Sequence, residues 1–345
     1  MPQLLKKYIN SKQPGTPGVL INDSLRIISQ NKIKNYERVF HKQKISGKKP
    51  LLWINNPQHY FSKTELEDDD RINSKMINVF VSGCSKDYAK LFSERNFKTY
   101  KAAKEAVLRT DTNHFEKKSI RELIRYGKKN GTVEEIEFTL KNKIKLELFK
   151  PECAHGREPQ LKYFFNDQFL PGTRLFVFLD EFGKWASAIL TAKIDDTHIR
   201  TDLLLRRKKA PKGTMELLIY TILNKLKSEG AKTWSLGDVP YVVYNSKVFS
   251  REFIINFTGR KLRFAYNYLG LYNFKNKFNP EWYDSYICTN SPRPLFVLTK
   301  IAIVSNLIKL IFFKLKILLK GPVFFMDNLF AGLSWKFANY FSFFI

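Results

Sequence analysis

The segment IRTDLLLRRKKAPKGTMELLI, residues 199–219, places basic side chains where a β-branched, apolar run passes into an amphipathic pattern. Such a junction directs backbone N–H groups and a helix N-terminus toward one spot, which favours the binding of an anion. Loss of cations there is expected to weaken binding of a polyanion and to flatten its salt dependence. The expected phosphate contacts of this basic turn (residues 206–213) are Arg206, Lys209, Lys212 and Gly213, with Arg207 beside them.

The chain as a whole shares this excess of positive charge. Its 345 residues include 59 Lys and Arg against 32 Asp and Glu, a formal net charge of +27. This predicts an anionic partner, either nucleic acid, an anionic lipid surface or a phosphorylated substrate. Because lysine is abundant together with Asn, Ile and Phe, about half of the excess is ascribed to ordinary solvated lysine. The first 50 residues are predicted to form a basic arm with one strand at 18–29.

The three cysteines, Cys84, Cys153 and Cys288, show neither metal-binding spacing nor a disulfide framework. They therefore predict a reducing, cytoplasmic setting and no metal. Cys153 lies two positions before His155, but this pair lacks the third, orienting group that nucleophilic catalysis needs. The first 15 residues contain no apolar stretch of signal-peptide length, so export is not expected.

Hydrophobic periodicity predicts the elements that position these residues. In residues 50–150, a helical face of Ile120, Leu123 and Ile124 ends at Gly131, a helix-stop signal. The strands expected in this unit are 76–83, 98–110, 132–140 and 143–149, and the helices are 85–96 and 113–131.

A second unit is expected from residue 151, beginning with an antiparallel meander. Its expected strands are 173–181, 184–194 and 199–205, followed by a helix at 213–228 and a strand at 233–240. Three strands, a basic turn, a helix and another strand is the order found in acetyltransferase-like folds, in which the strand-to-helix turn binds the pyrophosphate of an acyl donor. An analogy of fold alone does not fix the function.

The segment YNYLGLYNFKNKFNPEWYDSYI, residues 266–287, resembles the signature Y-N-F-x-G-L-x-x-F-K-x-K-F-x-P-x-W of the C-terminal catalytic domain of bacterial phosphatidylglycerol lysyltransferases. Two further segments resemble the same family. One is the A-P-x-G turn with its helix and N-L-G-x-x-P strand, where Ser235 replaces the Asn, and the other is the first-lobe helix, where Arg121 falls on a characteristic arginine. The matching residues of the signature are Tyr266, Asn267, Gly270, Leu271, Phe274, Lys275, Lys277, Phe278, Pro280 and Trp282.

The resemblance, which spans about residues 50–290, implies an α+β fold of tandem acetyltransferase-like (GNAT-related) lobes, with mixed, largely antiparallel sheets flanked by helices. It also implies an enzyme that transfers lysyl, or another aminoacyl group, from aminoacyl-tRNA to phosphatidylglycerol at the inner face of a bacterial membrane. The implied partners are tRNA and the anionic phospholipid surface, with no permanently bound cofactor. Most members carry a large N-terminal transmembrane translocase domain. The 345 residues of this chain leave no room for such a domain, so a stand-alone form is expected.

By the same resemblance, the expected catalytic residues are Asp202, Arg207 and Lys277, and Lys275 and Arg121 join the basic turn as contacts to phosphate or tRNA. The family carries a carboxylate followed three positions later by Arg, whereas this chain has Asp202 followed by Leu205. Side chains alternate between the two faces of a strand, so Arg207, two positions after Leu205, is expected on the same face as Leu205. Arg207 is therefore the candidate to replace that Arg. The other interpretation of the signature places Lys275 and Lys277 in solvent and its aromatic residues in the core.

The last part of the chain, residues 293–345, is expected to be a membrane-associating tail. Its apolar pattern is interrupted by lysines too often for a comfortable spanning helix. On a helical projection Ser305, Asn306 and Lys309 share one face with Lys316 and Lys320, which is typical of an interfacial helix on anionic lipid. A spanning segment and burial against the core remain alternatives.

The expected domains are therefore a basic arm (1–49), a first lobe (50–150), a second, catalytic lobe (151–292) and the tail (293–345). Two other functions remain open. One is an N-acyltransferase that uses acyl-CoA, although the basic turn lacks the glycine density of a typical pyrophosphate loop. The other is a non-catalytic relative that binds tRNA or membrane, which Leu205 in place of Arg favours.

Overall fold

The computed structural model of the protein describes residues 40–43, 50–59, 61–73, 76–164, 172–242 and 250–320. The strand expected at 18–29, most of the basic arm and the tail after Lys320 lie outside these residues.

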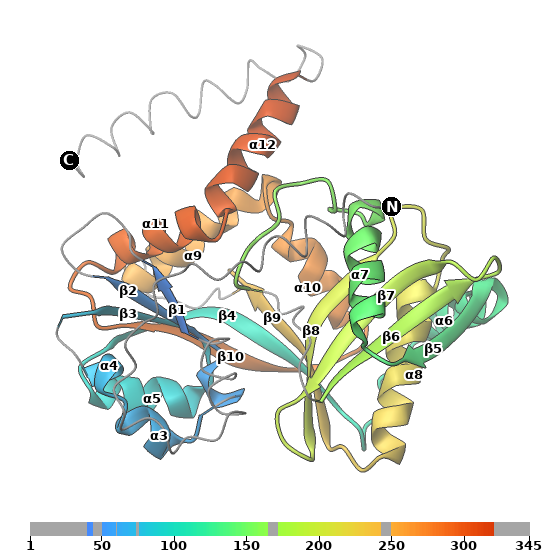
Figure 1. The fold of residues 1–345 in the computed structure, drawn as a ribbon, viewed down its shortest axis with the longest axis horizontal. Helices are drawn as coiled ribbons and strands as arrows, with labels where there is room; N and C mark the ends of the chain where they lie inside the picture. Colours follow the sequence, from blue (N-terminus) through green and yellow to red (C-terminus); the bar gives the residue numbers. More distant parts are fainter. Residues whose placement is uncertain are drawn as a thin grey trace. The chain divides into compact units, whose positions relative to one another are not determined.

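A single sheet of ten strands forms the centre of the fold, in the order β1-β2-β3-β10-β4-β9-β8-β7-β6-β5 (Figure 1). The pairs β2–β3 and β8–β9 are parallel, and the other pairs are antiparallel. The strands are β1 (Phe40–Gln43), β2 (Leu51–Asn55), β3 (Asn78–Cys84), β4 (Lys98–Arg109), β5 (Gly131–Ile136), β6 (Thr173–Asp180), β7 (Trp185–Lys193), β8 (His198–Arg206), β9 (Thr233–Pro240) and β10 (Glu281–Thr289). The expected mixed, largely antiparallel sheet is confirmed.

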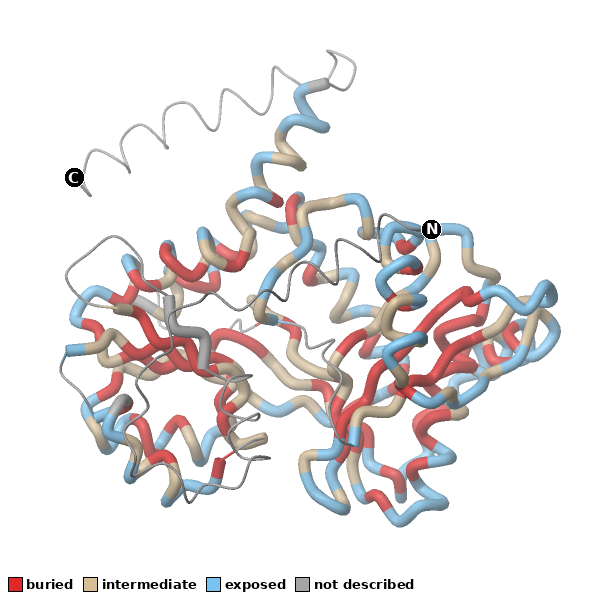
Figure 2. The backbone as a smooth tube through the Cα atoms, viewed as in Figure 1, coloured by how far each residue is buried: buried red, intermediate tan, exposed pale blue. Residues whose placement is uncertain are grey.

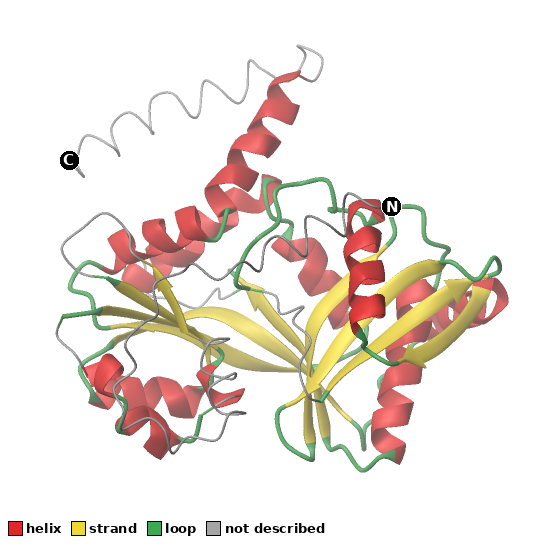
Figure 3. Cartoon of the chain, in the orientation of Figure 1, coloured by secondary structure: helices red, strands yellow, loops and turns green. Residues whose placement is uncertain are grey.

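Helices cover both faces of the sheet (Figure 3). On the half formed by β2, β3, β10 and β4, helices α3, α4 and α5 lie on one face, and α9 and α11 lie on the other (Figure 1). On the other half, α6 and α8 pack on one face and α7 on the opposite face. The helices are α3 (Lys63–Glu67), α4 (Asp70–Asn73), α5 (Lys86–Glu94), α6 (Lys118–Asn130), α7 (Leu140–Phe149), α8 (Thr214–Ser228), α9 (Arg251–Lys261), α10 (Tyr268–Asn276), α11 (Pro294–Val304) and α12 (Leu307–Lys320), with the 3₁₀ turns η2 (Pro57–His59), η3 (Lys150–Glu152) and η4 (Leu262–Phe264).

The main core lies between the sheet and α8. Ile219, Ile222 and Leu226 recur at helical spacing and are buried against Trp234 of β9. Burying such side chains contributes about 1.5–3 kcal/mol each, so this face holds α8 firmly on the strands. In Figure 2, long runs of buried residues follow the strands of the sheet.

The strand expected at 143–149 is wrong, because these residues belong to helix α7. Thr139 caps the helix by accepting a hydrogen bond from the backbone N–H of Asn142. Leu146 and Phe149, three residues apart, are buried against the sheet, whereas Leu148 is exposed. The alternating polar and apolar residues at 143–149 fit the pattern of a strand. The segment is helical because a helix buries Leu146 and Phe149 against the sheet.

Strands from either side of residue 150 alternate within the sheet. β5 pairs with β6, and β10 lies between β3 and β4. The two lobes therefore share one sheet, and a lobe boundary at 150–151 stays a prediction.

The helix expected to run through Ser305 and Asn306 is interrupted at these two residues. Asn306 has φ of 64°, which ends α11 and starts α12 in a new direction. Within the described part of the chain, no single helix has the length and apolar composition to cross a bilayer. Helices α11 and α12 have the required length and apolar composition only when they are counted together. The chain bends by 68° at the break between them.

Candidate functional site

Strands β8 and β9 run side by side for a short distance and then separate. Their parallel pairing covers only three residue pairs, from His198 with Thr233 to Arg200 with Ser235. Beyond this point β8 continues along β7, and β9 continues along β4. The edge of β9 that faces β8 therefore has carbonyl groups that need another partner when buried.

Lys275, from helix α10, supplies that partner. Its Nζ donates to the carbonyl oxygens of Gly237 at 2.8 Å and Asp238 at 3.2 Å. The residue is only 4% exposed, and this burial lowers the pKa of Lys275 to about 8. Of the two sequence interpretations, solvation of Lys275 is thus excluded.

Two carboxylic acids complete this buried cluster. Glu105 of β4 lies opposite Asp238 of β9 in the strand register, and each accepts a hydrogen bond from a serine hydroxyl, Ser235 and Ser285 respectively. Burial, together with the nearby charge of Asp238, raises the pKa of Glu105 to about 7. Burial also raises the pKa of Asp238. A carboxyl group with a pKa of about 7, as in Glu105, changes protonation near neutral pH, which is a property of acid–base catalysts.

A β-bulge in β9 brings these groups together. Glu105 pairs with Asp238 but Val107 pairs with Ser235, so β9 has one extra residue here. Gly237, inside the bulge, has φ of +85°, a conformation that favours glycine. Bulges of this kind redirect side chains and are frequent beside active sites.

Asp202 lies on β8 at the point of separation and forms an ion pair with Arg200, Oδ1 to Nε at 2.7 Å. Both side chains are more than nine-tenths buried. The strand register shifts at this position, because Leu203 pairs with Leu190 and Thr201 with Thr191. Arg200 also acts on η2, since burial and the Arg200 charge lower the pKa of His59 to about 3. The imidazole of His59 is therefore neutral at physiological pH.

Arg207 is held by the protein itself. Its guanidinium donates to Asp180 Oδ2 at 2.9 Å and to the carbonyl of Trp185, and its Nε lies 3.5 Å from Glu152. Arg206 is exposed and donates to the carbonyl of Ala210. These contacts fix the path of the basic turn.

Gly213 serves the packing of two helices. A Cβ on this residue would lie 2.0 Å from the carbonyl oxygen of Leu123 in α6, and φ is +84°. A Cβ on Gly127 of α6 would in turn lie 2.7 Å from the carbonyl oxygen of Gly213, so α6 and α8 pack backbone against backbone. Lys212 lies over the ring of Tyr126 at 4.8 Å. The role of the turn in anion binding stays a prediction, and Lys209 is exposed there.

Lys277 lies at the end of α10, with Nζ 3.2 Å from Glu216 Oε1 of α8. Its side chain is 44% exposed, whereas that of Glu216 is 9% exposed. Lys275 and Lys277 thus have different environments: Lys275 is buried against β9, and Lys277 is partly exposed beside α8.

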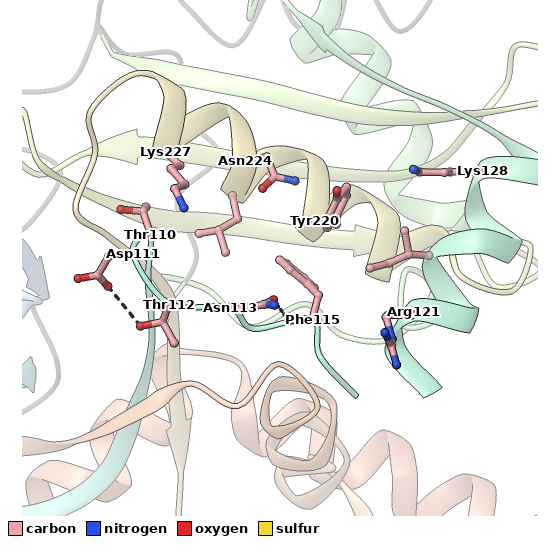
Figure 4. A pocket seen from close by; sticks show the side chains of 12 residues that line it. Thr110, Asp111, Thr112, Asn113, Phe115, Arg121, Lys128, Tyr220, Asn224 and Lys227 are labelled. Atoms are coloured by element: carbon pink, nitrogen blue, oxygen red, sulfur yellow. Dashed lines mark hydrogen bonds between the residues drawn. The ribbon is translucent and has the colours of Figure 1, made fainter. Parts of the chain in front are cut away.

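Arg121 lies apart from the basic turn, in a pocket of about 540 Å³ between α6, α8 and the segment after β4. Figure 4 shows Arg121 and Lys128 from α6 on one side, with Tyr220, Asn224 and Lys227 from α8 beside them. The Lys128 Nζ lies 5.7 Å from the centre of the Tyr220 ring. Cations beside an aromatic ring and an amide suit phosphates and a stacked base.

The predicted residues therefore fall in five places: Asp202 lies at the strand separation, Lys275 in the buried cluster, Arg121 in the pocket and Lys277 at the end of α10. The fifth place is the basic turn, which holds Arg206, Arg207, Lys209, Lys212 and Gly213. Sequence reasoning missed Glu105, Asp238 and Arg200. Arg200 could have been found from the sequence, because it is a charged residue within a mostly apolar expected strand, 199–205. In the residues that the structure describes, no three His, Cys, Asp or Glu side chains gather as a metal site requires.

Comparison with known proteins identifies related chains. The curated phosphatidylglycerol lysyltransferase of Bacillus subtilis (strain 168) is 30% identical over 101 residues, which is 29% of this chain and 12% of that protein. The structure of L-PGS from Bacillus licheniformis has a TM-score of 0.60 at 21% identity, covering 78% of this chain and 85% of that one. The C-terminal domain of a putative lysylphosphatidylglycerol synthetase from Agrobacterium fabrum also has a TM-score of 0.60, at 16% identity over 79% and 96%.

The two structural similarities confirm the expected α+β fold. The family model for the C-terminal region of phosphatidylglycerol lysyltransferases matches residues 70–289, well over half of the chain. This match includes the buried cluster, the strand separation and the cationic pocket. The chain belongs to the phosphatidylglycerol lysyltransferase C-terminal family.

Proposed function

We propose that this protein is an acyltransferase that moves an aminoacyl group from aminoacyl-tRNA to a head-group hydroxyl of phosphatidylglycerol. The observation that carries this proposal is the separation of β8 from β9 beside the Asp202–Arg200 pair and the buried cluster of Glu105, Asp238 and Lys275. The description of the family supports a lysyl group and phosphatidylglycerol as acceptor, and the tRNA donor is what the sequence resemblance implies. Because tRNA is cytoplasmic, the reaction takes place at the inner face of the membrane, with the protein bound peripherally.

The reaction needs a base and a stabilised oxyanion. The hydroxyl oxygen of the lipid attacks the ester carbonyl carbon, its proton passes to a carboxylate, and the bond to the tRNA ribose oxygen breaks as that oxygen takes up a proton. Glu105, with a pKa of about 7, is matched to hold this proton at neutral pH. The Lys275 ammonium supplies positive charge for the oxyanion. Asp202 orients the donor amino group or the attacking hydroxyl.

The cationic pocket suits the donor RNA. Arg121, Lys128 and Lys227 pair with phosphates, and Tyr220 offers a ring on which a base stacks. The alternative donor, acyl-CoA, would instead depend on the basic turn, whose Gly213 is in contact with α6.

The test is transfer by the purified full-length chain from labelled lysyl-tRNA to phosphatidylglycerol vesicles, read by lipid mass spectrometry, with other aminoacyl-tRNAs and acetyl-CoA as alternative donors. Asp202→Asn should lower turnover by about 100-fold or more, since it removes the charged group beside the reacting atoms. Asp196→Asn is the matched control, because that side chain is fully exposed. Unchanged turnover in folded Asp202→Asn would refute the assigned role, and transfer only from acetyl-CoA would refute the donor.

A further inference from the structure

Exposed apolar side chains gather on two segments of the described chain. Among the residues that the structure describes, sixteen large hydrophobic side chains are exposed, and nine of them lie in α9–η4 or in α11–α12. Those of α11–α12 are Phe296, Ile303, Phe312, Ile317, Leu318 and Leu319. A soluble surface normally scatters such residues singly, so a concentration of this kind marks an interaction site.

The two segments lie on the same side of the sheet. Figure 1 shows α9 and α11 on the face of β2, β3, β10 and β4 that is opposite α5. On α9, Phe253 and Phe257 stack at 5.7 Å, and the Lys261 ammonium lies 5.2 Å from the Phe257 ring. Phe257 is nevertheless 45% exposed, so one face of this aromatic pair is open to solvent.

Helix α12 is fixed at its base and projects from the body (Figure 1). The Asn306 side chain donates to the carbonyl of Gln160, and Leu310 is buried. Lys314 pairs with Glu158 at 2.5 Å. Beyond this contact, Ile317 and its two apolar neighbours are each 53% exposed.

The charge of this region has one sign. Residues 294–320 contain five lysines and no acidic residue. Lys309 and Lys316 are exposed, whereas Lys300 is buried and lies over the Phe296 ring. Lysines that border apolar side chains on a helix match an anionic head-group layer above acyl chains.

We propose that the exposed face of α11–α12, together with that of α9–η4, docks on the surface of an anionic phospholipid bilayer. The 68° bend and the fixed base of α12 suit a helix that lies in the interface rather than one that crosses it. This inference rests on the proposed function, which has the protein bound peripherally to the membrane, and it names the surface that docks. Vesicle binding requires neither donor nor transfer, so its failure is distinguishable from a failure of the transfer reaction.

The test is sedimentation of the full chain with phosphatidylcholine vesicles, with and without phosphatidylglycerol. The wild type should sediment only when phosphatidylglycerol is present. Lys309→Glu/Lys316→Glu should weaken binding by about 25-fold or more, since each lysine near an anionic surface is worth about fivefold. Phe312→Ser/Ile317→Ser should also lose binding. The matched control is Phe182→Ser/Lys184→Glu in the exposed β6–β7 turn, which should bind as the wild type does.

Three results would overturn the proposal. The first is unchanged binding by both variants of the α12 face, and the second is equal binding to vesicles of phosphatidylcholine alone. The third concerns other occupants. An environment-sensitive dye on Phe312→Cys should shift to the blue only when vesicles are added. A blue shift without vesicles would mean that another part of the protein already covers this face. Analytical ultracentrifugation then identifies what covers it: the end of the same chain if the protein is monomeric, or a second copy if it is dimeric.

Discussion

Replacing Lys275 by Met removes the only positive charge that the buried cluster is shown to contain among the described residues. The two carbonyl groups of β9 lose their donor, and Glu105 and Asp238 lose their counter-charge. Removing one partner of a buried ion pair costs about 3–5 kcal/mol, because the remaining charge stays buried. We expect Lys275→Met to lower the free energy of unfolding by this amount at pH 7.

The size of this loss should depend on pH. Without Lys275, the pKa of Glu105 rises further above its unfolded value of about 4.3. A carboxyl whose folded pKa is raised stabilises the fold while protonated, and this stability is lost as the pH rises through the folded pKa. The loss caused by Lys275→Met should therefore be smallest near pH 5 and largest near pH 9. Adding Glu105→Gln should reduce this dependence.

Urea unfolding at three pH values measures these effects. Lys90→Met in α5 is the matched control, because Lys90 and its partner Glu94 are both exposed and such a surface pair contributes at most about 1 kcal/mol. A loss below 1 kcal/mol for Lys275→Met, or an equal loss at every pH, would show that the cluster does not depend on this charge.

Two further predictions concern α6 and α8. Gly213→Ala should lower the free energy of unfolding by about 2–4 kcal/mol in urea titrations, since a Cβ meets the Leu123 carbonyl and the left-handed backbone adds strain. Gly183→Ala, with similar φ but no atom within 4 Å, should cost only about 1 kcal/mol, and equal losses would exclude the steric cause. Arg121→Ala/Lys227→Ala should reduce the salt slope of tRNA binding by about two, since each lost phosphate contact removes nearly one. A salt slope equal to the wild-type value in filter-binding assays would place the RNA elsewhere.

Elements with a strong local pattern could be predicted from the sequence. Helix α8 has apolar residues on one face and ends before Gly230, and the meander of β6, β7 and β8 is separated by turns with clear turn residues. Residues 140–149 could not be predicted in this way, because their alternating pattern fits a strand and only the contacts of Leu146 and Phe149 with the sheet decide for a helix.

The candidate site was less accessible to sequence reasoning than the fold. Lys275 and Asp202 were found through a family signature, but Glu105 meets Asp238 only because β4 pairs with β9 in one particular register. That register spans more than 130 residues and includes a bulge at Gly237. Nothing in the local pattern of either strand specifies such a pairing, so the acid with a pKa near 7 is apparent only in the folded chain.

The role of Arg207 stays a prediction, to which its contacts add a second interpretation. The expectation that Arg207 replaces the arginine missing at Leu205 rests on alternation along the strand, and β8 ends at Arg206, one residue before it. The guanidinium instead contacts Asp180, the Trp185 carbonyl and Glu152, which favours a structural role. Arg207→Met should therefore lower stability by about 1.5–3 kcal/mol, as expected for lost charged hydrogen bonds, and leave turnover of the folded enzyme within a few fold. Arg200→Met should abolish turnover, because it releases Asp202. If folded Arg207→Met loses turnover by 100-fold, Arg207 acts in the reaction after all.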